Sequence, residues 1–217
     1  MRTRHSGFTL VEIAIVLVII GLLLGGILKG QEMITQAKIK NAIADLSGTS
    51  AAYYGYRDRY RAVPGDDPNA NTRWTTPTAA TSGNGNGIVG GKYNSTTATD
   101  ESVNWWDHLR RAGFIAGSGS TQPLNAFTGM IGVQTGDAAA TPGPVLGGLT
   151  GLIICSAGLS DKVAIALDSQ MDDGKIDSGT VRGQLHTVGT NPDIQTAAAT
   201  SAYQETGTNS YTVCRTM

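Results

Sequence analysis

The chain has 217 residues, of which 40% are hydrophobic and 15% are charged, and its formal net charge is −1. This length allows one domain or slightly more, and a charge so close to zero excludes the global basic field that attracts nucleic acid. The 29 glycines favour a loop-rich β domain over a helical bundle.

The first predicted element is a membrane-spanning helix over residues 8–28. Residues 13–28 are all apolar or glycine, and a helix over the whole segment is about 31 Å long, which is enough to cross a bilayer. Arg2 and Arg4 precede the segment, so the positive-inside rule keeps the N-terminus in the cytoplasm. A secretory signal peptide is disfavoured because no convincing small-x-small cleavage site follows the apolar run.

Glu12 is a carboxylate inside this apolar segment, and a plain membrane anchor gives no reason for it. A charge within hydrocarbon costs roughly 2.5 to 3.5 kcal/mol on insertion scales, so such a residue usually has a partner. Cleavage after Gly7 would create one, because the new α-amine of Phe8 lies one helical turn before Glu12. Opposite charges at this i,i+4 spacing can neutralise each other, within one chain or between neighbours.

The residues around this position carry a family resemblance. The sequence Ser-Gly followed by Phe-Thr-Leu-Val-Glu, residues 6–12, resembles the leader-peptidase site of type IV prepilins and the related pseudopilins. The resemblance implies that a prepilin peptidase removes the leader, residues 1–7, and that Phe8 is then N-methylated. It also implies that Glu12 is the acidic fifth residue of the mature chain, where it forms an assembly charge pair with the Phe8 amine.

The resemblance implies a function as well as a processing site. The chain is expected to be a structural subunit of a type IV pilus-like filament, or fimbrium, with copies of itself, related pilins and an inner-membrane assembly platform as partners. It is expected in the bacterial inner membrane before assembly and in a cell-surface or periplasmic filament afterwards. Two alternatives stay open: a pseudopilin of a type II secretion system, and a minor or tip pilin that binds DNA or a surface.

The sequence contains no catalytic motif. Gly-x-Ser-x-Gly, zinc-binding and phosphate-loop patterns are all missing. No residue is therefore assigned a catalytic role, and the chain is not expected to be an enzyme.

The helical pattern continues beyond the membrane to about Tyr60, so one helix is predicted over residues 8–60. A mostly apolar stripe runs along its second half at spacings of four and three: Ile39, Ile43, Leu46, Ser50, Tyr53, Arg57 and Tyr60. Pro64 and the polar residues after it end the helix. The first half is apolar all round and suits lipid, whereas the second half is amphipathic and suits packing against a globular head.

Residues 61–217 are predicted to form that head. Residues 65–100 form a long polar connection. A short helix is predicted after it, with Asp100 as its N-cap and Gly113 at its end. Strands are expected near 148–154, 162–168, 180–188 and 210–215. The resulting fold class is α+β: a long N-terminal helix packed on an antiparallel β-sheet head, as in pilins.

Cys155 and Cys214 are the only two cysteines. A metal site needs more ligands than these, so a single disulfide in an oxidising compartment is the better interpretation. In the chain-entropy model, closing a loop of about 60 residues stabilises the fold by roughly 4 kcal/mol.

Four aspartates crowd into one short segment: Asp168, Asp172, Asp173 and Asp177. Hard oxygen ligands at this density suit Ca²⁺, but their spacing does not match an EF-hand. A polar turn is the favoured interpretation. Calcium is the alternative, supported by the resemblance because some pseudopilins bind Ca²⁺ near the C-terminus, and no other cofactor is expected.

Aromatic and basic residues also cluster near the end of the long helix. Arginines 57, 59 and 61 alternate with tyrosines there, a composition that can hold single-stranded DNA. The favoured interpretation is that the tyrosines pack the helix onto the head while the arginines are solvated or paired. Trp105 and Trp106 are expected in the core and at its rim.

Overall fold

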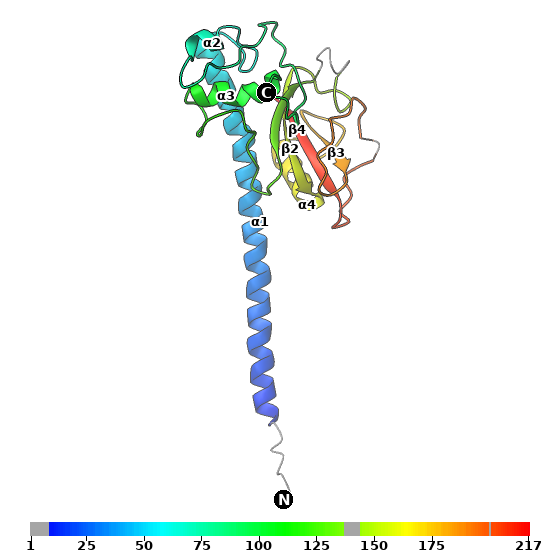
Figure 1. The fold of residues 1–217 in the computed structure, drawn as a ribbon. Helices are drawn as coiled ribbons and strands as arrows, with labels where there is room; N and C mark the ends of the chain where they lie inside the picture. Colours follow the sequence, from blue (N-terminus) through cyan, green and yellow to red (C-terminus); the bar gives the residue numbers. More distant parts are fainter. Residues whose placement is uncertain (1–8, 137–143, 200) are drawn as a thin grey trace, which may run out of the picture. The chain divides into compact units, whose positions relative to one another are not determined.

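The computed structural model describes residues 9–136, 144–199 and 201–217. The chain divides into two compact units, Met1–Lys38 and Ile39–Met217, and the second is called the head unit below. The secondary structure elements labelled in Figure 1 are α1 (Leu10–Tyr60), α2 (Ala70–Arg73), α3 (Glu101–Arg111), β1 (Ile131–Thr135), β2 (Leu152–Ser160), α4 (Asp161–Met171), β3 (Val181–His186) and β4 (Ser210–Thr216).

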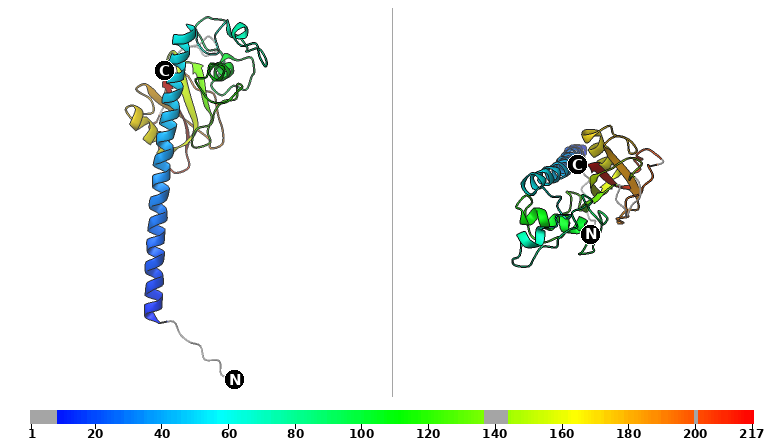
Figure 2. Two further views of the ribbon diagram at one scale, coloured as in Figure 1. Left: turned by 90° about the vertical axis from the view of Figure 1, so that its left-hand side faces the viewer. Right: turned by 90° about the horizontal axis from the view of Figure 1, so that it is seen from above.

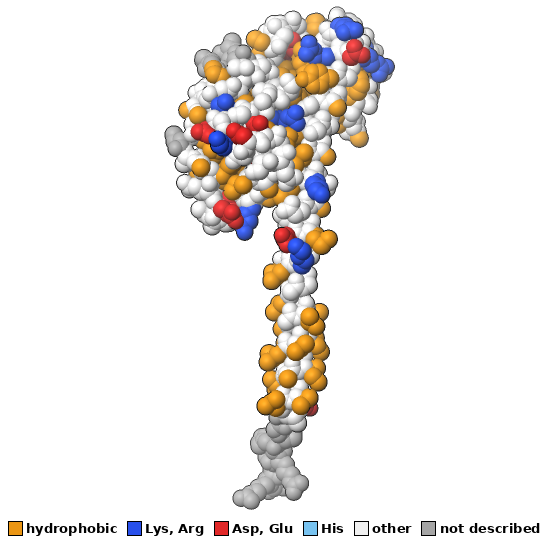
Figure 3. All heavy atoms as spheres, turned by 180° about the vertical axis from the view of Figure 1, so that it is seen from behind, with side chains coloured by type: hydrophobic (Ala, Val, Ile, Leu, Met, Phe, Trp, Pro, Cys, Tyr) orange, Lys and Arg blue, Asp and Glu red, His pale blue; other side chains and the backbone are white. Residues whose placement is uncertain are grey.

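The part of α1 before Ile39, residues 10–38, is called the N-terminal segment below. No side chain of this segment is buried, and its leucines, isoleucines and valines point outward all around the helix, as Figure 3 illustrates for one face. Leu10 is 86% exposed and Leu28 is 67% exposed. A helix that is apolar on every side needs an apolar environment, which this unit does not supply by itself.

The part of α1 in the head unit buries one side, as the amphipathic pattern predicts. The buried positions are Ile39, Ala42, Leu46, Thr49, Ser50, Ala52, Tyr53 and Tyr56. The predicted stripe wrongly included the exposed Arg57, and it omitted the buried Ala42, Thr49 and Ala52 and the fully buried Tyr56. The strict four-and-three spacing drifts from the true helical period of 3.6 residues, and Tyr56 is also drawn inward by a buried hydrogen bond to Asp67.

The head unit contains one four-stranded antiparallel sheet in the order β1-β2-β4-β3. Both faces of the sheet are buried. Ile154 and Val213 join the main core, to which α1, α3 and α4 also contribute, while Ile153 and Cys155 join a smaller cluster with loop residues on the other face. Helix α3 lies beside β1 (Figure 2).

The strand predicted over residues 162–168 is wrong, because this segment is the helix α4. Val163, Ala164 and Leu167 are its buried apolar residues, which is the i, i+1, i+4 pattern of a helical face rather than an alternating one. The apparent alternation of large and small residues arose from alanines, which are the best helix formers. Tertiary packing decides the conformation, since α4 contacts β2, β3 and β4.

The other strands lie close to their predicted positions, with two differences. Strand β1 was not predicted, and β2 runs from Leu152 to Ser160 instead of over residues 148–154. The short helix α3 is present, and Gly113 follows it with a positive φ of 79°, as expected of a glycine that ends a helix. Asp100 is at the N-cap but makes no capping hydrogen bond, and its carboxylate instead accepts one from the Ser95 hydroxyl.

The segment 65–100 is more ordered than a simple polar connection. It contains α2, and the carboxylate of Asp66 accepts hydrogen bonds from the backbone N–H groups of Gly85, Asn86 and Gly87 at 2.6, 3.2 and 2.7 Å. One buried carboxylate thereby fixes the turn formed by the Asn-Gly repeats. Trp105 and Trp106 are both fully buried in the core, so neither lies at a rim.

Candidate processing and assembly site

The predicted cleavage position lies outside the described residues. Gly7 and Phe8 both belong to the undescribed start of the chain, so the contact between the Phe8 amine and Glu12 stays a prediction. The first described residue is Thr9, and α1 begins directly after it.

Glu12 has a local partner that the sequence analysis missed. Its Oε2 accepts hydrogen bonds from the backbone N–H of Thr9 at 2.8 Å and from the Thr9 hydroxyl at 2.7 Å. In return, Thr9 Oγ1 accepts a 3.3 Å hydrogen bond from the N–H of Glu12. This reciprocal arrangement is a capping box, for which Thr-x-x-Glu is the sequence signal. Glu12 therefore helps to cap the start of the helix, in addition to carrying a charge.

The segment that follows has the properties of a membrane span. Helix α1 contains an 18-residue window with a mean hydropathy of 2.8, none of it buried. An exposed ion pair follows the apolar stretch, in which Lys29 Nζ lies 2.8 Å from Glu32 Oε2. By length and composition the helix can cross a bilayer once.

A long helix with an apolar N-terminal stretch, continued by an antiparallel sheet, is the α+β layout of pilin-like proteins. The model of the prokaryotic N-terminal methylation motif matches residues 2–28, and this motif is the prepilin signal of type IV pilins and pseudopilins. A comparison with curated proteins finds none that matches this chain. The motif supports a type IV pilin-like or pseudopilin protein, made as a membrane-anchored precursor. It implies processing by a prepilin peptidase and assembly into multimeric filaments.

The two cysteines form the disulfide that the sequence predicts. Cys155 on β2 faces Cys214 on β4 across the antiparallel pair, and their Cα atoms are 4.0 Å apart. Both residues are buried in the smaller cluster. The bond therefore joins the two central strands of the sheet and closes the chain over 59 residues.

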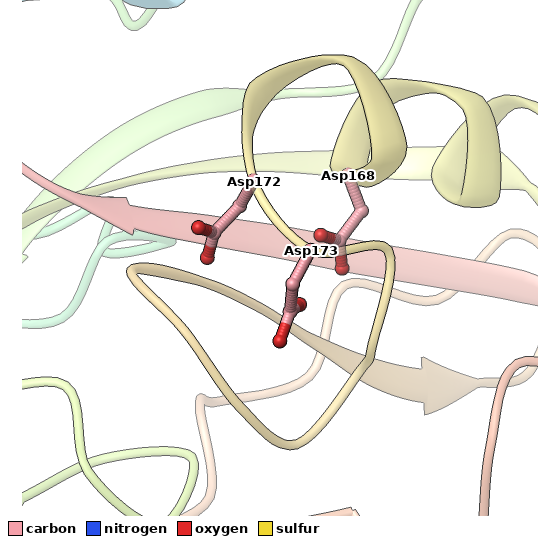
Figure 4. Close-up of side chains that lie close together, drawn as sticks. All are labelled: Asp168, Asp172 and Asp173. Atoms are coloured by element: carbon pink, nitrogen blue, oxygen red, sulfur yellow. The ribbon is translucent and has the colours of Figure 1, made fainter.

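Three of the four predicted aspartates lie close together at the end of α4 (Figure 4). The carboxylates of Asp168, Asp172 and Asp173 lie within 4.8 Å of one another, whereas Asp177 is not part of this group. All three already accept hydrogen bonds from nearby donors, which are Gly174, Lys175, Ser178, Thr180, Val181 and Tyr203. These hydrogen bonds fit the polar turn, and the same oxygens are the ligands that Ca²⁺ would use.

Asp168 is the unusual member of this group. Its side chain is buried, and burial raises its pKa to about 6, although hydrogen bonds from Tyr203 and Gly174 oppose the shift. The nearby negative charges of Asp172 and Asp173 raise the pKa further. In mildly acidic solution this carboxyl therefore carries a proton that an ordinary aspartate would have lost.

The arginines near the end of α1 are exposed, and the neighbouring tyrosines are packed to different degrees. Tyr53 and Tyr56 are buried in the core, whereas Tyr54 is 51% exposed. The guanidinium of Arg57 lies 5.6 Å from the centre of the Tyr53 ring, and that of Arg59 lies 5.3 Å from the Tyr60 ring. This arrangement agrees with tyrosines that pack the helix onto the head unit and arginines that stay in solvent.

Tyr56 belongs to a buried polar network that sequence reasoning did not find. Its hydroxyl donates a 2.6 Å hydrogen bond to the buried Asp67 carboxylate, which also forms an ion pair with Arg73. Burial alone would raise the pKa of Asp67, but the hydrogen bonds from Tyr56 and Arg73 lower it below its ordinary value. The network joins α1 to the segment that follows it.

His108 on α3 is held by the same segment. Its Nδ1 accepts a 2.9 Å hydrogen bond from the Gly65 N–H, and its Nε2 donates a 2.8 Å hydrogen bond to the Thr81 carbonyl. One acceptor and one donor nitrogen require the neutral imidazole. Burial lowers the pKa of His108, which keeps it in that form. Only the fold brings these residues together, and no short sequence motif predicts their contacts.

Proposed function

We propose that this chain is a structural subunit of a type IV pilus-like filament, released from its leader after Gly7 and assembled through α1. The observation that carries the proposal is the methylation motif over residues 2–28. Its part from Leu10 onward lies on a 51-residue helix whose apolar first part has no buried side chain. Such a surface needs lipid before assembly and neighbouring helices afterwards. When the helix moves from lipid into the fibre, this apolar surface stays out of water throughout.

Glu12 has a proposed role in the register of assembly. In a fibre core the carboxylate of an incoming subunit would meet the Phe8 amine of a subunit already in place. A buried charge without its partner costs several kcal/mol, so subunits shifted along the axis would be disfavoured. The hydrogen bonds from Thr9 satisfy part of the carboxylate within its own chain, which limits the cost of keeping it in the membrane before assembly.

The processing part of the proposal is tested by the intact mass of the assembled protein. The mass should correspond to a chain that begins at Phe8 and carries one additional methyl group. Fibre protein that still contains residues 1–7 would contradict it. A Gly7→Ala variant should accumulate as the unprocessed membrane form, because a Cβ crowds the position before the cut.

The filament part is tested by electron microscopy of cells that contain the assembly machinery and overproduce this chain as the only pilin. Long fibres that contain the chain as their main component are the expected result. The pseudopilin and the minor or tip pilin are the alternatives, since all three share the same N-terminal signal. Short periplasmic fibres that depend on a secretion machine would favour the pseudopilin, and incorporation only as rare copies would favour the minor pilin.

A further inference from the structure

A cleft of about 420 Å³ in the head unit has no role in the proposed assembly mechanism. It lies beside the last turn of α3, and its lining includes Trp74, Thr76, Thr78, Asp107, Arg110, Arg111 and Ser118. Two arginines, one carboxylate, one indole and several hydroxyl groups therefore line the same open space. This combination of one aromatic surface with a few polar groups is typical of a site for a small ligand.

The two arginines of the cleft differ in how their charges are compensated. Arg111 Nε lies 2.6 Å from the Asp107 carboxylate, and Arg111 Nη1 donates a 2.9 Å hydrogen bond to the Thr78 carbonyl. Arg110 donates only to a carbonyl, that of Gly119 at 2.7 Å. Among the described residues no carboxylate forms an ion pair with Arg110, and its buried Nε has no hydrogen-bond partner.

Arg110 is therefore a half-buried cation with no ion-pair partner of its own among the described residues, and the nearby negative charge of Asp107 is shared with Arg111. Burial disfavours its charged form and lowers its pKa, and a charge withdrawn from water is stabilised only by a partner that replaces the lost hydration. A carboxylate is the partner that fits a guanidinium best, because its two oxygens match the parallel N–H donors of the planar group. Since Asp107 already neutralises Arg111, the cleft has one surplus positive charge.

We propose that this cleft binds an acidic saccharide, with the carboxylate of a uronic acid on Arg110 and the sugar ring near Trp74. One surplus cation, beside the Arg111–Asp107 ion pair and several hydroxyl groups, matches a ring that bears one carboxylate and several hydroxyls. An acidic peptide would offer carboxylates without a hydroxyl-bearing ring to place near Trp74 and the hydroxyl groups of the lining. This inference rests on the proposed filament function and extends it. A surface that carries acidic saccharides would be the target to which the head unit of the filament attaches.

The test is a titration of the full chain, in detergent micelles and with its disulfide intact, with trigalacturonate and with the neutral trisaccharide galactotriose. Isothermal calorimetry should give saturable binding of trigalacturonate and at least a tenfold weaker interaction with galactotriose. Arg110→Gln should weaken trigalacturonate binding at least tenfold. Arg59→Gln is the matched control: it removes one exposed charge outside the cleft and should change the affinity less than twofold.

Arg110→Lys is a second variant that keeps the charge and loses the planar fork, so its affinity should lie between those of the native chain and Arg110→Gln. It also serves if Arg110→Gln fails to fold, which a shifted melting temperature would reveal. Equal binding of the two trisaccharides, unchanged binding by both Arg110 variants, or tighter binding of a tri-aspartate peptide overturns the proposal. Because the measurement uses monomers in micelles, failure of filament assembly does not affect it.

Discussion

The N-terminal segment and the head unit both have apolar side chains that must be kept out of water, and they achieve this in opposite ways. No side chain of the segment 10–38 is buried within its own unit, so its apolar surface must be covered by lipid or by other helices. The head unit covers its own apolar side chains with a sheet buried on both faces, a disulfide and buried hydrogen bonds. A substitution in the first region should therefore alter association, and one in the second should alter folding.

The largest expected effect is on assembly, and it comes from Glu12→Gln. Glutamine can take the same place in a capping box, so α1 should still begin at Leu10 while the charge is lost. We expect the amount in sheared fibres to fall by roughly tenfold or more, because an unpartnered buried charge costs several kcal/mol and each 1.4 kcal/mol is tenfold. Fractionation into membrane and fibre pools measures this, and membrane insertion should be unchanged.

The matched control is Thr9→Val, which removes the cap hydroxyl and keeps the charge of Glu12. It should cost the helix about 1 kcal/mol and leave fibres largely intact. If Thr9→Val abolished fibres while Glu12→Gln formed them normally, the carboxylate would act as a helix cap, and the charge-pair account would be wrong. Neither substitution should change the melting temperature of the head unit.

The next largest effect is on the head unit, from loss of the bond between β2 and β4. Cys214→Ser should lower its free energy of unfolding by about 2 to 5 kcal/mol and leave membrane insertion unchanged. Chemical denaturation of the exported protein, with and without reductant, measures the difference. The native chain under reducing conditions should approach the variant, and a variant as stable as the oxidised native protein would contradict the prediction.

A smaller loss of stability is expected from Tyr56→Phe. The substitution removes the hydroxyl that donates to the buried Asp67 carboxylate and leaves the ring in place. We expect a loss of about 1 to 3 kcal/mol, the cost of an unsatisfied buried polar group. Tyr54→Phe is the control, since Tyr54 is exposed and should cost almost nothing. Equal melting temperatures of the two variants would show that the network contributes no stability.

His108 should make the head unit sensitive to mild acid. Its pKa is lowered in the folded protein by burial, whereas an unfolded histidine titrates near about 6.5. The unfolded chain therefore takes up this proton first, so the contribution of His108 is complete above pH 6.5 and is lost as the pH falls below it, by at most about 1.4 kcal/mol per pH unit.

The comparison that isolates this effect is between the native chain and His108→Gln, melted at pH 7.5 and at pH 5.5. The stability difference between the two proteins should shrink as the pH falls. Comparing variants removes the opposite contribution of Asp168, whose raised pKa makes the fold more stable toward acid. His186→Gln, which alters a partly exposed histidine, should retain the full pH dependence, and a pH-independent difference for His108→Gln would refute the prediction.

The smallest expected effect is that of calcium. Because the three clustered aspartates already accept hydrogen bonds from nearby groups, the melting temperature should barely change when Ca²⁺ is added or removed with chelator. A rise with Ca²⁺ that Asp173→Asn abolishes would instead establish the metal site. Asp177→Asn is the matched control, because Asp177 lies outside the group.

The sequence by itself determined the N-terminal segment, and the reason is that its rules are local. Apolar length and the spacing between Phe8 and Glu12 can both be read along one chain, and Gly113 could be recognised as a helix end in the same way. The Thr-x-x-Glu cap signal is equally local, although it was recognised only in the structure. The disulfide was also predictable, because two cysteines allow only one pairing within a chain.

Only the tertiary structure decided the conformation of residues 162–168 and the environment of Tyr56. The alternation of Val163, Ile165 and Leu167 fits a strand and a helix equally well over so short a distance, and contact with three strands selected the helix. The cleft around Arg110 was hidden for the same reason. Its lining joins residues 74–78 to the last turn of α3, and packing rather than any local pattern brings these segments together.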